Sequence, residues 1–303
     1  MKIIFMGTPD FAVPALDALH RAGHEIPLVF SQPDKPSGRG QKIHPSPVKS
    51  YALAHGLRVE QPFSLRKGDD SVKSLELIKE LNPDIIIVAA YGQILPRIVL
   101  DAPRLGCVNI HASLLPRWRG ASPINYCIMS GDKESGVTIM RMEEGIDTGG
   151  MFLSERCEIT DEMNSRELHD KLKEIGARLI TRFAENPEKY IKNMTAQNYA
   201  EATYAPMITK EMKKIDLNKS ALEIYNFIRG LTGEAYCMLG EKRLKVFSSE
   251  IIEKSDIFNH KAGTITESLE IICGDMKILR MLEIKPEGKN KMSAEEFLRG
   301  VRN

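Results

Sequence analysis

The sequence predicts an α/β fold: a doubly wound, mostly parallel sheet followed by a small antiparallel β-barrel. In the first half of the 303 residues, short apolar runs alternate with amphipathic segments of helical period. Continuous apolar runs such as "DIIIVAA", residues 84–90, are typical of parallel strands buried on both faces. In the last third, short strand-like runs are separated by Gly and charged turns, which is the spacing of a small barrel.

The first half is expected to open with a strand at 2–7 and a helix at 11–23, with Asp10 as the helix cap. A long loop rich in Pro and Gly interrupts the alternation after the second strand. The remaining elements are expected as strands at 25–30, 57–62, 84–90, 106–110 and 136–142 and helices at 48–56, 71–82 and 123–131. Ligands of doubly wound sheets bind at the carboxyl ends of strands. The residues expected to gather there are Gly7, Ala90, Asn109, His111 and the region after Met142.

Two domains joined by a linker are expected along the chain. A long amphipathic helix at 165–186 closes a catalytic domain of residues 1–187, and the polar, irregular stretch 188–208 is expected to be a linker. A barrel domain at 209–303 then contains a helix at 220–231 and short strands. Those strands are expected at 235–239, 243–252, 263–267, 269–274 and 277–284.

Composition places few limits on the partners. Forty-two basic and 41 acidic side chains leave a net charge of +1, so only local clustering can indicate nucleic acid. The five cysteines are scattered without CxxC spacing and are expected to be buried thiols in a reducing compartment, with no metal site. No leader sequence and no apolar run of about 18 residues is evident, which predicts a cytoplasmic protein without a membrane partner.

Asn109 and His111, in "VNIH", are the first candidates for chemistry. At i and i+2 on a strand their side chains share one face, so an amide and an imidazole can donate to one developing oxyanion. The alternative for an isolated N-x-H is that both satisfy backbone groups at a strand end. Asp147, in the Gly-rich turn "EEGIDTGG", follows a strand expected to end at the same edge and can orient His111 or relay protons. An ordinary turn residue is the alternative for Asp147.

The Pro/Gly-rich loop at 31–49 carries Lys35, Arg39 and Lys42. Its local positive charge suits a phosphate backbone, and a solvated flexible loop is the alternative. The turn "GTPDFA" lacks the later glycines of GxGxxG and lacks the Walker pattern. HExxH and GxSxG are also missing from the sequence, so metal and serine-hydrolase chemistry are not supported.

Several motifs in succession resemble those of the methionyl-tRNA formyltransferases. They are "GTPDFAVPAL", "SQPDKPSGRGQKIHPSPVK", "AAYGQILP", "GCVNIHASLLPRWRGASPI" and "GVTIMRMEEGIDTGGM". The resemblance covers nearly all of residues 1–210 and continues more weakly to the C-terminus. It implies a Rossmann-like catalytic domain and an OB-like barrel. It also implies formyl transfer from 10-formyltetrahydrofolate to the α-amine of initiator methionyl-tRNA for translation initiation, without a metal. A monomer is expected.

The resemblance also implies roles for individual residues. The catalytic positions match Asn109, His111 and Asp147; the folate-binding positions match Ser113, Leu114, Leu115, Pro116, Gln93, Ile94 and Leu95; and the tRNA-contacting insertion matches the loop of Lys35, Arg39 and Lys42, with Arg39 as its key residue. The chain departs from the family pattern at "TGEAY", at Met207 and at Leu217. These departures concern tRNA contacts of the barrel and leave the formyl-transfer site unchanged.

Three alternatives stay open on the sequence. A formyltransferase acting on a purine precursor or a nucleotide sugar shares N-x-H, "SLLP" and the distant Asp, but lacks the basic loop. A formyl-folate hydrolase has no use for that loop. A non-catalytic tRNA-binding protein keeps the loop and barrel, but does not need Asn109, His111 and Asp147 together.

Overall fold

The structure is a computed structural model and describes residues 1–37, 42–252 and 261–302. The chain packs into two compact units, each made of segments that are discontinuous in the sequence. The first unit contains Met1–Gly120, Ser135–Cys157 and His169–Tyr204, and the second contains Ala121–Glu134, Glu158–Leu168 and the described part of Ala205–Asn303. The domain limits expected from the sequence are continuous stretches and remain a prediction.

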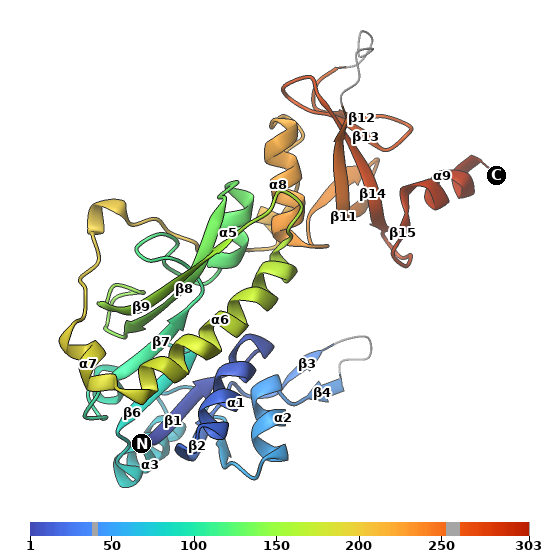
Figure 1. The fold of residues 1–303 in the computed structure, drawn as a ribbon. Coiled ribbons are helices and arrows are strands. Elements are labelled where there is room, and N and C mark those ends of the chain that lie inside the picture. The colour runs from blue at the N-terminus through green and yellow to red at the C-terminus, as the bar shows by residue number, and fades with distance from the viewer. Residues whose placement is uncertain (38–41, 253–260, 303) are drawn as a thin grey trace. The chain divides into compact units, whose positions relative to one another are not determined.

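A seven-stranded sheet forms the centre of the first unit, in the order β5-β2-β1-β6-β7-β8-β9 (Figure 1). The expected mostly parallel, doubly wound sheet is confirmed, because β1 pairs in parallel with β2 and β6, and β6 with β7. Strand β8 pairs antiparallel with β7. The hydrogen bonds from the Arg141 N–H to the Gly150 carbonyl and from the Ile159 N–H to the Lys133 carbonyl show that β8 and β9 also run antiparallel. The strands are β1 Lys2–Gly7, β2 Glu25–Phe30, β5 Val59–Glu60, β6 Ile85–Ala89, β7 Cys107–His111, β8 Glu134–Arg141 and β9 Met151–Glu158.

Helices cover both faces of this sheet. Gly176 of the long helix α6 lies so close to Ile110 of β7 that a Cβ there would come within 2.9 Å of the isoleucine side chain. Side chains of α3 and α4 pack with Cys107 on the other face of β7. The helices of this unit are α1 Val13–Arg21, α2 Pro47–Ala54, α3 Asp69–Leu81, α4 Arg97–Leu100, α6 Ser165–Glu185 and α7 Pro187–Lys192.

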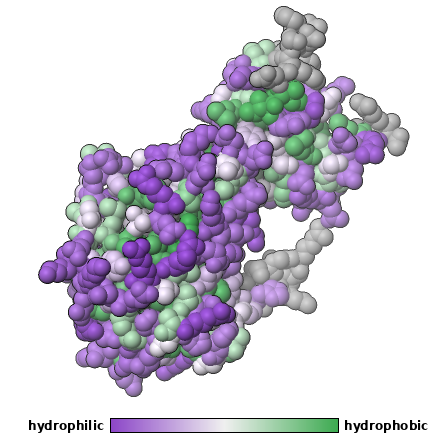
Figure 2. Space-filling view, viewed as in Figure 1, coloured by the Kyte–Doolittle hydropathy of each residue, from purple (hydrophilic) through white to green (hydrophobic). Residues whose placement is uncertain are grey.

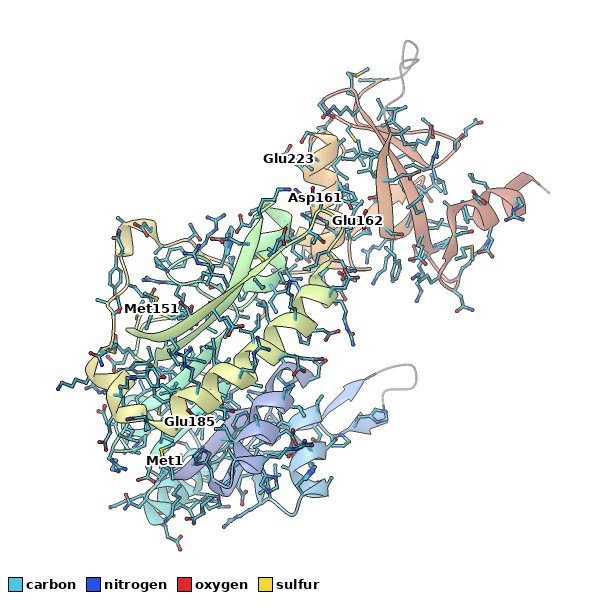
Figure 3. The ribbon with its side chains drawn as sticks, viewed as in Figure 1. Met1, Met151, Asp161, Glu162, Glu185 and Glu223 are labelled. Atoms are coloured by element: carbon cyan, nitrogen blue, oxygen red, sulfur yellow. The ribbon has the colours of Figure 1, made fainter. Side chains whose placement is uncertain are left out.

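Several features of the first unit differ from the sequence expectation, and the short helix α4 is one of them. Strand β9 was not expected either; it begins at Met151, the residue labelled in Figure 3, and Phe152 and Cys157 are its buried side chains. The stretch expected as an irregular linker contains α7 and a 3-10 turn, η2 Tyr199–Glu201. The ends of the Pro/Gly-rich loop pair as an antiparallel hairpin, β3 Lys35–Ser37 and β4 Lys42–His44. A hairpin is compatible with Pro36 because proline is tolerated in edge strands.

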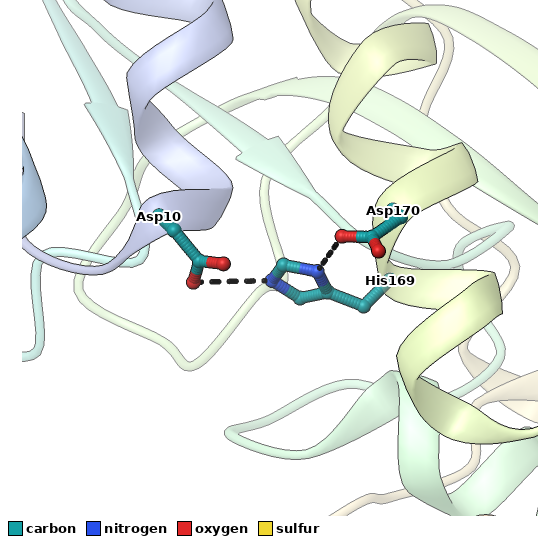
Figure 4. Close-up of side chains that lie close together, drawn as sticks. All are labelled: Asp10, His169 and Asp170. Atoms are coloured by element: carbon teal, nitrogen blue, oxygen red, sulfur yellow. Dashed lines mark hydrogen bonds and ion pairs between the residues drawn. The ribbon is translucent and has the colours of Figure 1, made fainter.

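Asp10 does not cap a helix, which corrects the expectation. It begins a short 3-10 turn, η1 Asp10–Ala12, and neither η1 nor α1 has a side-chain cap. Its carboxylate instead lies 3.6 Å from Nε2 of His169 on α6, whose Nδ1 is 3.1 Å from Asp170 (Figure 4). The Lys173 ammonium also bonds Asp170, at 2.7 Å. These close polar contacts join η1 to α6.

The second unit is built on an antiparallel sheet with strand order β10-β11-β14-β13-β12, and β15 pairs with β14. This barrel-like domain confirms the expected fold class. Its helices are α5 Pro123–Met129, α8 Ala221–Leu231 and α9 Ala294–Arg302, with a 3-10 turn, η3, at Glu211–Lys213. Its strands are β10 Tyr236–Leu239, β11 Lys242–Ile252, β12 Thr264–Ile265, β13 Glu270–Ile272, β14 Ile278–Pro286 and β15 Met292–Ser293. Strand β15 and α9 were not expected.

Helix α5 packs on α8 within this unit. The Asn125 amide donates to the Gly230 carbonyl at 2.7 Å, and a Cβ on Gly230 would lie 2.5 Å from the Met129 side chain. The hydrophobic core runs from α8 to the sheet and includes Ile224, Val246 and Leu279. A glycine at position 230 therefore allows the two helices to approach closely.

The exposed face is largely polar, and the cysteines are buried as the sequence predicts. The face in Figure 2 is largely hydrophilic, with separate hydrophobic areas. All five cysteines are buried, and burial raises the pKa of the Cys107 thiol, which disfavours a reactive thiolate. Within the part of the chain that the structure describes, no helix has both the length and the apolar character needed to cross a membrane.

A capping box at the start of α8 yields a stability prediction. The Ser220 hydroxyl accepts from the Glu223 backbone N–H at 3.3 Å, and Glu223, labelled in Figure 3, accepts from the Ser220 backbone N–H at 3.0 Å. We expect Ser220→Ala to lower the free energy of unfolding by about 1 kcal/mol in urea titrations followed by circular dichroism. Ser220→Asn, which keeps a capping oxygen, is the control, and equal losses in the two variants would refute the cap.

The same box sets the pH range of its contribution. Hydrogen bonds from the Ser220 hydroxyl and backbone lower the pKa of Glu223 to about 2. A carboxyl group whose pKa is lowered in the folded state stabilises the fold at pH values above its ordinary pKa. This stabilisation is lost as the pH falls toward the lowered pKa. The difference between wild type and Ser220→Ala should therefore persist at pH 5–7 and shrink as the pH approaches about 2.

Candidate active site

Asn109 and His111 lie on one face at the carboxyl end of β7. Their alternation continues the row begun by Cys107, which packs against α3 and α4, while Ile110 points to α6 on the other face. His111 is 5% exposed. Asn109 is partly buried, and no hydrogen bond to its side-chain amide occurs among the described residues. The amide is thus a polar group without a protein partner beside a buried imidazole.

Asp147 reaches His111 by a different route from the one expected. Strand β8 is antiparallel to β7, and Arg141 at its end pairs with Val108 rather than with His111. The expectation that β8 ends at the carboxyl edge of the parallel strands was therefore wrong. The loop 142–150 turns back instead, and it brings a carboxylate oxygen of Asp147 to 3.6 Å from Nδ1 of His111. Asp147 adopts a left-handed backbone, with φ of 51°.

The environment of the pair fixes the imidazole. Nε2 of His111 lies 2.9 Å from the Trp118 carbonyl oxygen, which can only accept, so this nitrogen carries a proton. The same Asp147 oxygen that faces Nδ1 accepts from the Gly120 backbone N–H at 2.8 Å. Because Nε2 is held by the carbonyl, Nδ1 is the ring nitrogen that faces Asp147 and can exchange a proton.

The loop after β7 is held in shape by a buried threonine of β8. Thr138 donates to the Ser113 carbonyl at 2.7 Å and accepts from the Leu115 N–H at 3.2 Å. The Ser113 hydroxyl donates to the Arg117 carbonyl at 2.6 Å, and the Leu115–Pro116 peptide bond is cis. Each of these hydrogen bonds joins a side-chain hydroxyl to a backbone group that the irregular loop would otherwise leave unpaired.

Trp118, whose role the sequence did not indicate, contributes mainly its backbone. Its φ is 62°, its carbonyl meets His111, and its N–H donates to the Thr203 hydroxyl at 2.9 Å. The guanidinium of Arg117 lies 4.4 Å from the centre of the Trp118 ring, which is a cation–π contact. The indole therefore stacks with Arg117, while the main chain of Trp118 orients the imidazole.

The segment Gln93–Leu95 offers less to a ligand than the sequence suggested. The Gln93 amide is committed to the loop after β5: it accepts from the Leu65 N–H at 3.0 Å and donates to the Pro62 carbonyl at 2.8 Å. Leu95 is 4% exposed and belongs to the core. Ile94 is 61% exposed, so it is the side chain of this segment that is free to pack on an apolar ring.

The predicted tRNA-binding residues lie on or beside the β3–β4 hairpin. Lys35 and Lys42 belong to its two strands, and Arg39 lies outside the described residues. At the base of the hairpin, Asp34 accepts from Lys49 at 2.5 Å and from Gln61 at 2.8 Å. These bonds, with Lys49 the largest cause, lower the pKa of Asp34.

Two residues near the pair were missed by the sequence. Arg119, 1% exposed, donates to Oε1 of Gln197 at 3.0 Å and 2.8 Å. Gln197 is 5% exposed and bonds the loop that carries Asp147. Arg119 lies in the motif "SLLPRWRG", where an arginine beside Trp118 gives no sign of being buried, and Gln197 lies in an irregular stretch without periodicity.

The arrangement is suited to acyl transfer. An unpartnered amide, an imidazole with one nitrogen held and a carboxylate facing the other nitrogen supply oxyanion donors and a proton relay. The apparent His–Asp separation of 3.6 Å is long for a hydrogen bond, and catalytic bonds are often long before substrate binds. No covalent enzyme intermediate is needed by such a site.

The chain is similar to known proteins along nearly its whole length. Residues 1–183 match the family model "Formyl transferase", and residues 207–302 match "Formyl transferase, C-terminal domain". Proteins named methionyl-tRNA formyltransferase are 46% identical in Gluconobacter oxydans, covering 99% of this chain and 97% of the relative, and 44% identical in Alkaliphilus oremlandii, covering 99% and 96%. A solved N-formyltransferase of Helicobacter canadensis, in complex with folinic acid and dTDP-3-aminofucose, has the same fold. Its TM-score is 0.68 at 22% identity, with coverage of 93% of this chain and 99% of that one.

The hydrogen bonds of Thr138 give a testable prediction. Replacement by Val keeps the shape but leaves the Ser113 carbonyl and Leu115 N–H without a partner. We expect Thr138→Val to lower the free energy of unfolding by about 1–3 kcal/mol, measured in urea. Thr138→Ser keeps the hydroxyl and should cost about 1 kcal/mol or less, for the lost methyl group. A larger loss in Ser than in Val would contradict the role given to the hydroxyl.

Proposed function

Since this chain belongs to the methionyl-tRNA formyltransferase family, we propose that Asn109, His111 and Asp147 form its formyl-transfer site. The enzyme transfers a formyl group to the α-amino group of methionyl initiator tRNA, for translation initiation. The observation that supports the site is that strand β7, which carries Asn109 and His111, and the loop 142–150, which carries Asp147, meet there, with His111 facing Asp147 at 3.6 Å.

The proposed mechanism follows from which groups are free. The methionyl amine attacks the formyl carbon, and negative charge develops on the formyl oxygen. The Asn109 amide donates to this oxygen, and the protonated form of His111 donates from Nδ1, since Nε2 is held by the Trp118 carbonyl. Asp147 accepts the proton that the amine loses, directly or through a water, and the proton passes to the folate nitrogen that leaves.

We propose 10-formyltetrahydrofolate as the donor; relatives of this fold are known with folate-derived ligands. The loop Ser113–Pro116 lies directly after His111 and is fixed by Thr138, and this rigidity suits a surface that positions a ligand. Exposed Ile94 is the side chain of its segment that suits packing against the pterin. Gln93, through its hydrogen bonds, and Leu95, through its burial, fix the backbone on either side of it. The donor's residues therefore divide into contacting and supporting ones.

We propose that the β3–β4 hairpin with Lys35, Arg39 and Lys42 contacts the tRNA backbone. Its strands place basic residues on both arms, and Asp34 ties the base of the hairpin to α2 through Lys49. A tRNA substrate implies that the chain acts in the cytoplasm, where charged initiator tRNA is found. We propose separately that it acts as a monomer.

Loss of either His111 or Asp147 should strongly lower turnover without unfolding the protein. We expect His111→Ala and Asp147→Ala to lower the rate of formyl transfer to methionyl-tRNA by two or more orders of magnitude, as for the loss of an oxyanion donor or a proton relay. Thermal unfolding of each variant provides the control for folding. Near-normal turnover in either purified, folded variant would refute the site.

The role of the hairpin is tested by the salt dependence of tRNA binding. Loss of one phosphate contact should reduce the slope of log K against log salt concentration by about 0.9 or less. We expect this for Arg39→Ala, together with weaker binding and an unchanged rate at saturating tRNA. Arg182→Ala, which removes an exposed arginine of α6, is the matched control. Equal effects of the two variants would show that only total charge matters.

A further inference from the structure

We propose that Gln197, held by the buried Arg119, is a positioning residue that sets the place of Asp147 during formyl transfer. The inference rests on the proposed function, because Gln197 is argued to act through Asp147 and not on the substrate. It concerns residues 195–204, a segment of the first unit that follows α7 and is joined to the start of β9 by backbone bonds between Thr195 and Met151.

The Gln197 side chain connects two parts of the site. Its Nε2 donates to the Asp147 carbonyl at 2.8 Å and to the Gly149 carbonyl at 2.7 Å. Its Oε1 accepts two bonds from Arg119, through Nε at 3.0 Å and one terminal nitrogen at 2.8 Å. One buried amide therefore joins the loop after β7 to the loop that carries Asp147.

The chemistry of the neighbours permits only one orientation of this amide. A guanidinium only donates and a carbonyl only accepts, so the oxygen must face Arg119 and the NH₂ group must face the two carbonyls. A flipped amide would oppose donor to donor and acceptor to acceptor. Glutamine fits this position because its side chain has both an accepting oxygen and a donating NH₂ group. An apolar residue would leave Arg119 and both carbonyls without these bonds.

Arg119 is an unusual anchor because it is a buried cation without an acidic partner. It is 1% exposed, and among the described residues no carboxylate forms a salt bridge with it. Its guanidinium instead lies 4.6 Å from the ring centre of Tyr199, and its backbone N–H donates to the Thr203 carbonyl at 2.9 Å. Its position is therefore set by the segment 199–203 on the same side as Gln197.

Asp147 is held at two points, and both connect it to the adjacent residues Arg119 and Gly120. Gln197 holds its backbone carbonyl, and the Gly120 N–H, one residue beyond Arg119, holds its carboxylate at 2.8 Å. The left-handed φ of 51° is uncommon for a residue with a side chain and persists only where the surroundings impose it. Loss of the Gln197 donors should let the carboxylate move relative to Nδ1 of His111, and a displacement of about 1 Å can cost about 100-fold in rate.

The decisive substitution is Gln197→Glu. It keeps an oxygen toward Arg119 and turns the bond into an ion pair, but it replaces the NH₂ donor with an oxygen that faces two carbonyls. In single-turnover formyl transfer at saturating donor and methionyl-tRNA, we expect the rate constant to fall by about 10- to 100-fold. The KM of each substrate should change by less than about threefold, since neither substrate is proposed to touch Gln197.

A double-mutant cycle separates positioning from general damage. If Gln197 acts through Asp147, then adding Gln197→Glu to Asp147→Asn should lower the residual rate by less than about twofold. Equal fold losses in the wild-type and Asp147→Asn backgrounds would overturn the inference. A normal rate for Asp147→Asn alone would instead refute the proposed site itself, so the two failures are distinguishable.

Two controls keep the test valid. Asn186→Asp changes an amide to a carboxylate in the same part of the chain, at the N-cap of α7, where either residue caps equally well. It should leave the rate unchanged, and a comparable loss there would overturn the assignment to Gln197. If Gln197→Glu does not fold, as judged by thermal unfolding, Gln197→Met enters the same cycle and the same two outcomes apply.

Discussion

The site depends on the hydrogen bonds that tie the loop 142–150 to the loop that follows β7. Strand β8 is antiparallel to β7 and ends beside Val108. The loop that carries Asp147 therefore starts near the amino end of β7, whereas His111 lies at its carboxyl end. The Gly120 N–H and the Gln197 amide hold this loop in its returned position. Without those bonds, the sheet alone gives no reason for a carboxylate to face His111.

The backbone carries the cost of this arrangement. Trp118 and Asp147 both have positive φ, one on each of the two loops, and such conformations cost about 1–3 kcal/mol each for residues with side chains. Gly149 is required where the second loop turns into β9, because a Cβ there would lie 2.1 Å from the Arg141 carbonyl oxygen. Of the seven non-glycine residues with positive φ in the described part of the chain, Trp118 and Asp147 are the two that meet the imidazole through a backbone or side-chain group.

The sequence predicted the parts of the site that follow from local periodicity. The i, i+2 spacing of Asn109 and His111 is enough to place both on one face of β7. Asp147 lies 3.6 Å from His111 as expected, whereas the direction of β8 differs from the expectation, because strand direction depends on pairing between distant segments. Gln197 has a role defined only by its three partners, Arg119, Asp147 and Gly149, and nothing near it in the sequence indicates them. Asp10 likewise has the sequence position of a helix cap, but its carboxylate faces His169, a residue distant in the sequence.

The most direct measurement is a crystal structure of this enzyme with a folate whose formyl group cannot be transferred. The formyl oxygen should lie within about 3 Å of the Asn109 amide nitrogen, on the face of β7 shared with His111. The pterin should pack beside Ile94, and the loop Ser113–Pro116 should keep its bonds to Thr138. A folate bound with its formyl group remote from Asn109, for example in the groove between α1 and α6 lined by Asp17 and Arg182, would contradict the assignment of the formyl-transfer site.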